Sequence, residues 1–330
     1  MNIGVIGAGD HAERSHLRFL ADAEEHRVAA MADLDRAKMD AVSQRLNLDA
    51  HHTTDWEEVL GDSTIDAVFI MTPDRLHATQ LAAAVAVGKH VFCEKPLADT
   101  PVTYNKISQA LDEARDKGLV VSSCHPRRFD PPFVQTKEFL DDRALLGDAF
   151  GLAGDLGDVI GFNFAFRYHA PSKVGLHQSL MFDHLNHEVD LANYFFGVSG
   201  LSRAIALHDS ALRYEVSAVR DDGIGLAFRG GRFLDSRIYQ EDMRIDFERG
   251  MLAMDMHEGT ALLQYEDKAA FGRSLLYKTD YDVRFAGVND HFLLAAEGLE
   301  PPYLTAEELR LNTLAAVALR GSSEAVTVRP

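Results

Sequence analysis

The first 123 residues of the chain alternate short apolar runs with longer amphipathic segments, and this alternation constrains the fold more than any other feature. Short apolar runs are typical of buried strands, and the segments between them have the periodicity of helices. The expected strands are Ile3–Ile6, Val28–Ala32, Ala67–Met71, His90–Cys93 and Leu119–Ser122. The expected helices are His11–Ala23, Arg36–Leu46, Arg75–Val87 and Val102–Lys117. Such alternation predicts βαβ units that build a parallel sheet.

The pattern changes after Ser123, where we place a domain boundary. At 330 residues the chain is long enough for two ordinary domains. A helical pattern covers Leu180–Phe196, and residues 201–268 then form short alternating segments separated by turns that contain glycine, which favours an antiparallel sheet. The sequence therefore predicts an α/β protein, with a parallel-sheet domain at residues 1–123 and an α+β domain at residues 124–330.

Charge and cysteine content argue against several classes of function. The chain has 51 acidic and 33 basic residues and a net charge of −18, which disfavours binding to nucleic acid or to anionic membrane surfaces. Cys93 and Cys124 are too few for a disulfide framework or a cysteine-based zinc site. The longest uncharged apolar stretch, Leu81–Gly88, is far shorter than the ~20 residues that span a bilayer. The first strand is expected to begin at residue 2, which leaves no room for a signal peptide, so we expect a cytoplasmic protein.

A glycine-rich turn, Gly7-Ala8-Gly9-Asp10-His11-Ala12, follows the first expected strand directly. In a dinucleotide-binding loop the first glycine permits the tight turn, and the second lets the backbone approach a pyrophosphate. Gly7 and Gly9 would take these roles, while Ala12 would allow close packing of helix on strand. The following helix N-terminus favours an anion. Such a turn can be purely structural, but the strand before it and the helix after it favour a dinucleotide site.

Asp33 ends the second expected strand, where this fingerprint places the acidic residue that binds the adenine ribose. A carboxylate there accepts hydrogen bonds from the ribose hydroxyls and repels a 2′-phosphate. Leu34 and Asp35 supply no cation that would relieve the repulsion. We therefore expect NAD as the cofactor, with NADP less favoured. In the alternative interpretation, Asp33 only caps a turn or the next helix.

The sequence Glu94-Lys95-Pro96 follows the fourth expected strand. Ligands of open α/β sheets bind in the crevice at the carboxyl ends of the strands, so Lys95 is expected to point into that crevice. A dinucleotide loop combined with a cation at a later strand end predicts a cofactor and a charged group that acts on its partner. Lys95 would stabilise negative charge that develops on a reacting oxygen.

A second group of titratable residues lies in the helical pattern over Leu180–Phe196. Asp183 and His187 are four residues apart and Asp190 is three further on, so all three would share one face of a helix. An aspartate one turn before a histidine can orient the imidazole and stabilise its charged form. With a reference pKa of ~6.5, a histidine accepts a hydroxyl proton at neutral pH. Removal of a hydride from a carbinol needs such a base.

Two other interpretations of this helix stay open. Charged residues at helical spacing usually form a solvated face, although the apolar neighbours Leu180, Val189 and Phe195 argue against one here. The same spacing also suits two metal ligands. Further candidate ligands lie nearby: His177, His184 and Glu188. We favour the acid–base interpretation and expect no metal.

Several motifs resemble the signature of the Gfo/Idh/MocA oxidoreductase family. They are Thr72-Pro73-Asp74-Arg75-Leu76-His77, the segment Ala84–Gly88, Lys89-His90-Val91 and Glu94-Lys95-Pro96. His16, nine residues after Gly7, also resembles the first helix of that family. The resemblance implies a Rossmann domain followed by an α/β domain with a large open antiparallel sheet. It also implies a nicotinamide cofactor and, usually, a sugar or polyol substrate.

The resemblance also implies roles for individual residues, because Asp183, His187 and Asp190 match a family pattern. It implies a catalytic set of Lys95, Asp183 and His187. Cofactor contacts are implied for Gly7, Gly9, Asp10, His11, Ala12, Asp33, Thr72, Pro73, His77, Glu94 and Lys95. Substrate contacts are implied for Arg127, Tyr168, His169, Asp183 and His187, although Arg127 or Arg128 could instead simply pair with a carboxylate.

The sub-pattern around Asp183, and the sequence Arg127-Arg128-Phe129-Asp130, resemble inositol dehydrogenases more than the average member. The chain departs from the family at Gly175–Ser179, where many members have a glycine run, and at Leu185, where a glycine is common. These departures affect the expected substrate pocket more than the expected chemistry.

The sequence thus predicts an NAD-dependent dehydrogenase of a sugar, cyclitol or related polyol. A glycoside hydrolase or eliminase of the same family, which uses NAD transiently, is one alternative. A non-catalytic NAD-dependent sensor is another, but retention of Lys95, Asp183 and His187 argues against it, because a sensor needs no base. Exposed sheet faces of the implied kind usually pair, so we expect a homodimer or homotetramer.

Overall fold

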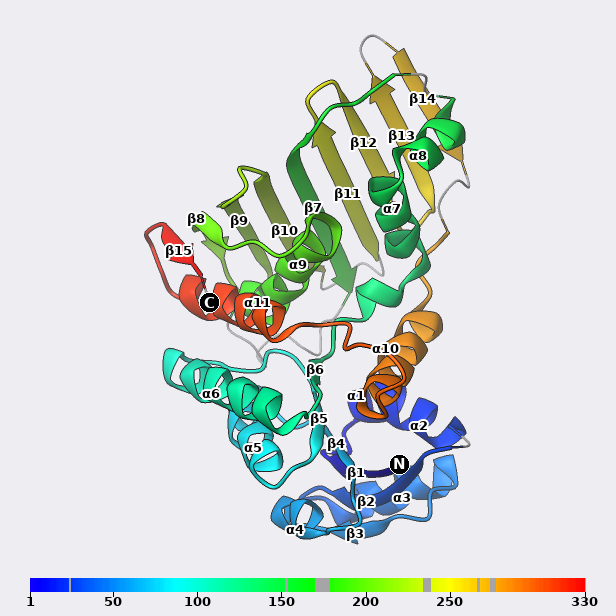
Figure 1. Ribbon diagram of the computed structural model, residues 1–330, viewed down its shortest axis with the longest axis vertical. Helices are drawn as coiled ribbons and strands as arrows, with labels where there is room; N and C mark the ends of the chain where they lie inside the picture. The colour runs from blue at the N-terminus through cyan, green and yellow to red at the C-terminus, as the bar shows by residue number, and fades with distance from the viewer. Residues whose placement is uncertain are drawn as a thin grey trace. The chain divides into compact units, whose positions relative to one another are not determined.

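The computed structural model describes the chain except residues 24, 152–153, 170–178, 234–238, 266–267, 274–276 and 330. The chain divides into two compact units (Figure 1). Unit 1 comprises Met1–Pro126 and Phe285–Thr313, and unit 2 comprises Arg127–Arg284 and Leu314–Pro330. The domain boundary expected after residue 123 stays a prediction.

Unit 1 is built on a six-stranded sheet with the order β3-β2-β1-β4-β5-β6, in which every neighbouring pair is parallel. The strands are β1 (Asn2–Ile6), β2 (Arg27–Ala32), β3 (His51–Thr53), β4 (Ala67–Ile70), β5 (His90–Cys93) and β6 (Val121–Ser123). The strand order reverses between β1 and β4, and the crevice of such a sheet opens at the carboxyl ends of these strands. The predicted parallel α/β domain is confirmed.

The helices of unit 1 begin and end at residues that suit those positions. They are α1 (Asp10–Ala12), the π-helical segment η1 (Glu13–Leu17), α2 (Arg18–Asp22), α3 (Arg36–Leu46), α4 (Trp56–Gly61), α5 (Asp74–Ala86) and α6 (Pro101–Lys117). The Asp35 carboxylate caps α3 by accepting the Lys38 N–H. Thr100 and Thr103 form a capping box at the start of α6, and Gly118 ends that helix with a φ of 69°.

The core of unit 1 also includes residues from late in the chain. Phe69 on β4 and Phe92 on β5 stack with ring centroids 4.8 Å apart. Phe292 packs edge-on against Phe69 and is fully buried, and it comes from α10 (Tyr281–Ala296). Burial of this aromatic cluster explains why the chain returns to the first unit after residue 284.

Unit 2 contains a nine-stranded sheet with the order β14-β13-β12-β11-β7-β10-β9-β8-β15. The strands are β7 (Val159–His169), β8 (Leu201–Asp209), β9 (Arg213–Arg220), β10 (Gly225–Phe233), β11 (Gln240–Phe247), β12 (Gly250–Asp255), β13 (Thr260–Tyr265), β14 (Lys268–Arg273) and β15 (Val326–Val328). All neighbours are antiparallel except β7 and β10, which are parallel. The large sheet is therefore mixed, because β10 returns beside β7 through the β8–β9 hairpin.

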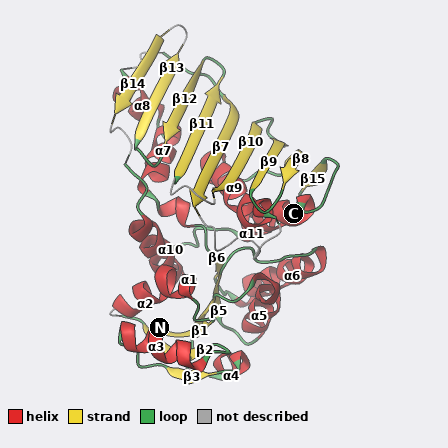
Figure 2. Cartoon of the chain, turned by 180° about the vertical axis from the view of Figure 1, so that it is seen from behind, coloured by secondary structure: helices red, strands yellow, loops and turns green. Residues whose placement is uncertain are grey.

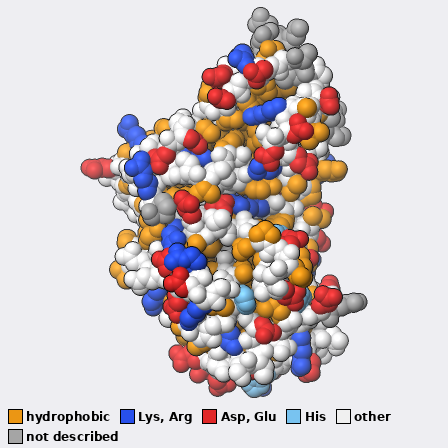
Figure 3. Space-filling model, in the orientation of Figure 1, with side chains coloured by type: hydrophobic (Ala, Val, Ile, Leu, Met, Phe, Trp, Pro, Cys, Tyr) orange, Lys and Arg blue, Asp and Glu red, His pale blue; other side chains and the backbone are white. Residues whose placement is uncertain are grey.

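Helices cover one face of this sheet, and the strands are uncovered by helices on the other face in the part of the chain described (Figures 1 and 2). The remaining helices are η2 (Pro126–Phe129), α7 (Pro131–Asp141), α8 (Arg143–Phe150), α9 (Leu180–Phe196) and α11 (Ala306–Leu319). Along β9 and β10, side chains that are buried alternate with side chains that are more exposed. None of the described helices is long and apolar enough to cross a membrane. Acidic and basic side chains are interspersed on the face shown in Figure 3.

Candidate active site

The glycine turn of unit 1 has the geometry that a dinucleotide loop requires. Gly7 has a φ of 99°, and a Cβ there would lie 2.6 Å from the carbonyl oxygen of Met71, so only glycine fits. Gly9 precedes α1 in an extended conformation, and a Cβ there would meet nothing within 4 Å. Ala12 is buried at the start of the continuous helix Asp10–Asp22. The turn thus leaves open space at Gly9, as close approach of a pyrophosphate demands.

Asp33 lies directly after β2 and is bonded to the same turn. Its Oδ2 accepts the Ala8 N–H at 2.8 Å and its Oδ1 accepts the Asp35 N–H at 2.9 Å. The turn-capping role weighed above is therefore present in the structure. Each carboxylate oxygen has a further lone pair, so these bonds are compatible with acceptance of ribose hydroxyls. The neighbouring Leu34 is 90% exposed and brings no positive charge.

Thr72, Pro73 and His77 lie at the carboxyl end of β4 and the start of α5. The two ring nitrogens of the buried His77 lie 2.6 Å from the Thr72 carbonyl oxygen and 2.8 Å from that of Pro96. His77 therefore links the end of β4 to the segment after β5. Its geometry favours a role in shaping the crevice through the backbone.

Glu94 and Lys95 follow β5 directly. The buried Glu94 lies within hydrogen-bonding distance of the Nε2 atoms of His11 and His16, at 2.9 and 2.8 Å from its Oε1. Burial by itself would raise the pKa of Glu94, but the two histidines outweigh it and hold that pKa well below its usual range. Lys95 is half-buried, and its backbone N–H donates to Glu94 Oε2 at 3.1 Å.

The ligand atoms of His11, His16 and Glu94 lie within 4.8 Å of one another, which is a spacing compatible with a metal ion. The short distances from Glu94 Oε1 to both rings are those of hydrogen bonds. A hydrogen-bonded charge network therefore accounts for this arrangement. No residue pattern in the sequence had pointed to it.

In unit 2, α9 carries the predicted acid and histidine. Ser179 caps the helix by accepting the Phe182 N–H. Asp183 is 7% exposed, and His187 is half-buried. Asp190 is buried and binds the Arg128 guanidinium, with its Oδ1 2.8 Å from Nη2. This buried ion pair gives Asp190 a structural role in anchoring α9.

Asp183 belongs to a polar cluster where β7 and β10 end. Tyr168 and Arg232 are register partners on these parallel strands, and Arg232 Nη2 donates to the Tyr168 hydroxyl at 3.0 Å. His184 Nε2 lies 3.2 Å from the same hydroxyl and 3.4 Å from Asp183 Oδ2. The side chain of Arg232 has no exposed surface, and its Nη2 lies 3.7 Å from Asp183 Oδ2. The cluster thus brings a predicted catalytic residue and a predicted substrate contact together.

Arg127 pairs with a carboxylate, which was the alternative to a substrate contact. Its Nε and Nη2 donate to Glu241 Oε1 at 3.0 and 2.6 Å, and both side chains are buried. His169 lies at the end of β7 and is exposed. The segment Gly175–Gln178, which includes His177, lies outside the described residues.

Glu188, next to His187 on α9, is fully buried beside the Arg127–Glu241 pair. Its polar neighbours include Arg127 and the buried hydroxyl of Tyr214. Burial raises the pKa of Glu188 to about 8, although Arg127 opposes the shift. Because Arg127 is already bound to Glu241, Glu188 is the second acid beside this cation, and burial favours its neutral form.

We therefore expect Glu188 to make the stability of the enzyme pH-dependent. A raised pKa in the folded state contributes stability below the unfolded value, and this stability is lost as the pH rises toward 8. Between pH 5 and pH 8 the free energy of unfolding should fall by roughly 2–4 kcal/mol more in the wild type than in Glu188→Gln. Urea unfolding at the two pH values measures this difference. Glu258→Gln, at an exposed carboxylate, is the matched control, and equal slopes for wild type and Glu188→Gln would contradict the assignment.

Several residues of the site carried no signal that sequence spacing could reveal. Arg232, Glu241 and Asn289 are each far along the chain from the residues that they contact. The sequence indicates His184 only as a candidate metal ligand. The cofactor residues predicted from the sequence lie in unit 1 with Lys95, whereas Arg127, Tyr168, His169, Asp183 and His187 lie in unit 2. The joint action of Lys95 and His187 stays a prediction.

Comparison with known proteins identifies the relatives of the chain. Residues 1–125 match the model of GFO_IDH_MocA, described as an oxidoreductase family with an NAD-binding Rossmann fold. An uncharacterized oxidoreductase of Bacillus subtilis, YrbE, is 25% identical over 305 residues, which cover 86% of this chain and 84% of the relative. An inositol 2-dehydrogenase of Cereibacter sphaeroides is 32% identical over 232 residues, which cover 68% of this chain and 63% of the relative.

A solved structure extends the likeness of the fold over nearly the whole chain. The crystal structure of KijD10, a 3-ketoreductase from Actinomadura kijaniata in complex with NADP and TDP-benzene, has a TM-score of 0.76 at 20% identity and covers 97% of each chain. The family match includes the open glycine turn, Asp33 and Lys95, and the relatives carry the similarity into unit 2. Residues 1–125 therefore belong to the NAD-binding Rossmann domain of the Gfo/Idh/MocA oxidoreductase family, and the similarity to oxidoreductases continues beyond them.

Proposed function

We propose that this oxidoreductase is an NAD-dependent dehydrogenase, which transfers a hydride between NAD and a CH–OH group of a sugar, cyclitol or related polyol. The observation that carries the proposal is that the open turn at Gly9 and Lys95 both follow strands of one parallel sheet. Ligands of such sheets bind at this edge. The name of the Cereibacter relative, an inositol dehydrogenase, supports a cyclitol among the candidate substrates.

The residues of the chain would divide the chemistry as follows. The turn Gly7–Ala12 and Asp33 would hold the dinucleotide, whose nicotinamide accepts the hydride when bound. His187 would take the proton of the substrate hydroxyl at an imidazole nitrogen, with Asp183 orienting the ring. The Lys95 ammonium would stabilise negative charge on the same oxygen. The action of these groups on one substrate is part of the proposal.

A substrate panel tests the proposed activity. The purified chain is mixed with NAD and, separately, with cyclitols, aldoses and sugar acids, and the reduction of NAD is followed by absorbance. We expect reduction with at least one polyol or sugar. NAD that stays bound but is reduced by no member of the panel would favour the hydrolase or the sensor instead.

The preference for NAD is expected to depend on the charge of Asp33. NAD(H) should bind at least about tenfold more tightly than NADP(H), a difference of about 1.4 kcal/mol. Asp33→Asn keeps an acceptor for the Ala8 N–H but removes the repulsion of a 2′-phosphate. The difference in affinity between NAD(H) and NADP(H) should therefore become smaller. Titration calorimetry with both cofactors measures this difference. Asp35→Asn, at the cap of α3, should keep the preference, and equal affinities in the wild type would refute NAD selectivity.

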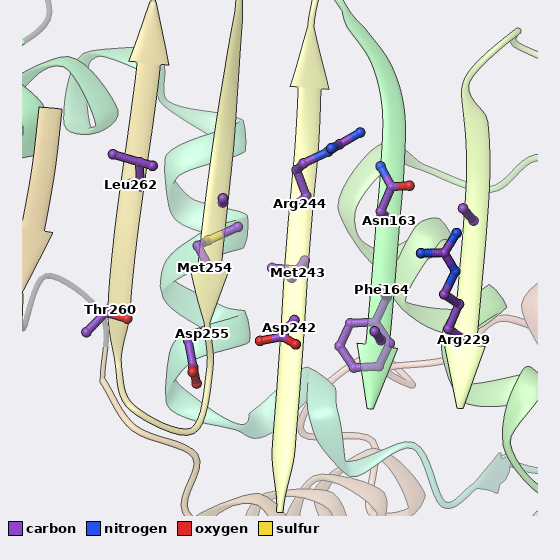
Figure 4. A pocket seen from close by; sticks show the side chains of 13 residues that line it. Asn163, Phe164, Arg229, Asp242, Met243, Arg244, Met254, Asp255, Thr260 and Leu262 are labelled. Atoms are coloured by element: carbon purple, nitrogen blue, oxygen red, sulfur yellow. The ribbon is translucent and has the colours of Figure 1, made fainter. Parts of the chain in front are cut away.

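We also propose that the uncovered face of the large sheet forms the contact of a homodimer or homotetramer in the cytoplasm. A hollow of about 410 Å³ lies on this face, lined by residues of the strands from β13 to β10. Figure 4 shows the side chains that line it. Small and apolar side chains such as Ala253 and Leu262 line it together with charged ones such as Arg244 and Asp255. A second copy of the sheet could cover such a mixed surface.

A further inference from the structure

We propose that Asn289, His16 and Glu94 form a positioning network for Lys95, which fixes the backbone of the lysine through hydrogen bonds that run from α10 to the end of β5. All four residues belong to unit 1, where α10 lies beside the helix Asp10–Asp22 (Figure 1). The effect on turnover rests on the function proposed for Lys95. The effect on the backbone does not depend on that function.

The network starts at Asn289, whose side-chain amide is oriented by the two hydrogen bonds that its NH₂ group donates. Its Nδ2 donates to the carbonyl oxygens of Ser15 at 2.9 Å and Phe285 at 2.6 Å. Its Oδ1 therefore faces His16 Nδ1, which lies 2.7 Å away. An amide oxygen only accepts hydrogen bonds, so Nδ1 of His16 carries a proton. Asn289 is 1% exposed, and no exchange with bulk water competes with these bonds.

His16 passes this constraint to Glu94. Its Nε2 lies 2.8 Å from Glu94 Oε1, which is the distance of a hydrogen bond. His16 thus contacts Asn289 through one ring nitrogen and Glu94 through the other. The pair is buried, with His16 unexposed and Glu94 6% exposed. Loss of either partner would leave a buried polar group without its hydrogen bond, so the arrangement holds Glu94 in one orientation.

The π-helical segment η1 explains how His16 reaches this position. The segment Glu13–Leu17 interrupts the helix after the glycine turn, and His16 is one of its three buried residues. A π-helical turn rotates the side chains that follow it and is frequent at functional sites. The half-exposed His11, one turn earlier, adds a second contact to Glu94 Oε1 at 2.9 Å.

Glu94 then holds Lys95 by its second oxygen. Oε2 accepts the Lys95 N–H at 3.1 Å, and an ionised carboxylate is a stronger acceptor than a neutral one. The next residue, Pro96, has no N–H to anchor the chain. Glu94, whose direction is set by His16 and His11, therefore holds the backbone of Lys95 at its N–H. An ammonium that must meet a developing charge gains from such support, because displacement of a catalytic group by about 1 Å can cost 10²-fold in rate.

Amide hydrogen exchange tests the backbone part of the proposal and needs no substrate. In Glu94→Gln the Lys95 N–H should exchange at least about tenfold faster than in the wild type, because its charged acceptor is lost. Asn289→Ala should speed the same amide to a smaller extent. His11→Gln, at a half-exposed position, replaces a buried variant that fails to fold. It should also speed exchange of the Lys95 amide. Glu113→Gln, at an exposed carboxylate of the same unit, is the control. Unchanged exchange at Lys95 in Glu94→Gln and His11→Gln would overturn the network.

A double-mutant cycle tests whether the network acts through Lys95. Glu94→Gln should lower kcat about tenfold or more in the wild type but should cost almost nothing further in Lys95→Ala. Equal losses in both backgrounds would mean that Glu94 acts separately, and would overturn the positioning role. A wild type that oxidises nothing on the substrate panel, but whose Lys95 amide responds to Glu94→Gln, would instead refute the proposed function and keep the backbone network.

Discussion

Lys95→Ala should lower kcat by about 10²-fold or more, while the affinity for NAD stays within a few-fold of the wild type. The loss corresponds to removal of one preorganised group that stabilises a developing oxyanion, about 2.7–4 kcal/mol. Lys95 follows β5 at the carboxyl edge of the sheet, whereas the dinucleotide would be held by the glycine turn and Asp33. Steady-state kinetics and NADH fluorescence titration separate the two effects.

The chain offers a matched control in a lysine that directly precedes the same strand. Lys89 stands at the other end of β5, where its Nζ donates to the carbonyl oxygens of Asp62 and Ile65. Lys89→Met should therefore lower stability and leave kcat close to the wild-type value. If Lys95→Ala keeps turnover within a few-fold of the wild type, the lysine is structural and the oxyanion role is wrong.

The parallel domain could be predicted because its pattern is local. Strands that are buried on both faces are short apolar runs, and β4 and β5 occur where such runs occur. The α3 helix matches its expected bounds, because the capping Asp35 and the left-handed Asn47 mark both ends within the sequence. The three-residue strand β3, His-His-Thr, has no apolar run and was not expected.

The sheet of unit 2 shows what a local pattern cannot give. Alternating segments indicate strands, but they do not show which strands pair or in which direction. The parallel pairing of β7 and β10 joins residues 159–169 to residues 225–233 across α9 and a hairpin. No strand was expected over residues 159–169, yet β7 lies near the centre of the sheet. This pairing is what places Arg232 beside Tyr168.

The candidate site was predictable only where a motif carries its own chemistry. Gly7, Gly9, Asp33 and Lys95 follow strand ends, so their type and position indicate a role. Asn289 is an asparagine inside a helix, and only the tertiary fold shows that its amide faces His16. The buried hydrogen-bond and ion-pair partners of the site come from segments that are far apart along the chain. The spacing of residues in the sequence therefore does not reveal them.

The predicted acid–base pair gives a second large effect. His187→Ala should lower kcat by about 10²–10⁴-fold, which is the range for loss of a general base. Asp183→Asn should also lower kcat, and the double variant should be little worse than His187→Ala, because both residues serve one proton transfer. Asp190→Asn, three residues after His187, removes an ion pair with Arg128 and should cost stability rather than turnover. Additive losses of Asp183 and His187 would show separate roles.

The pH dependence of this pair separates a base from a metal site. Polyol oxidation should fall at acidic pH, because a protonated imidazole cannot accept the hydroxyl proton. A carboxylate neighbour favours the charged imidazole, so Asp183→Asn should move this acid limb to lower pH as activity drops. Asp183 Oδ2 also lies 3.4 Å from His184 Nε2. The pH–rate profile of His184→Gln is therefore measured too, to show whether the acid limb comes from His184 or from His187. If the limb of Asp183→Asn does not move, and chelator abolishes an activity that divalent metal restores, the helix holds a metal and His187 is not the proton acceptor.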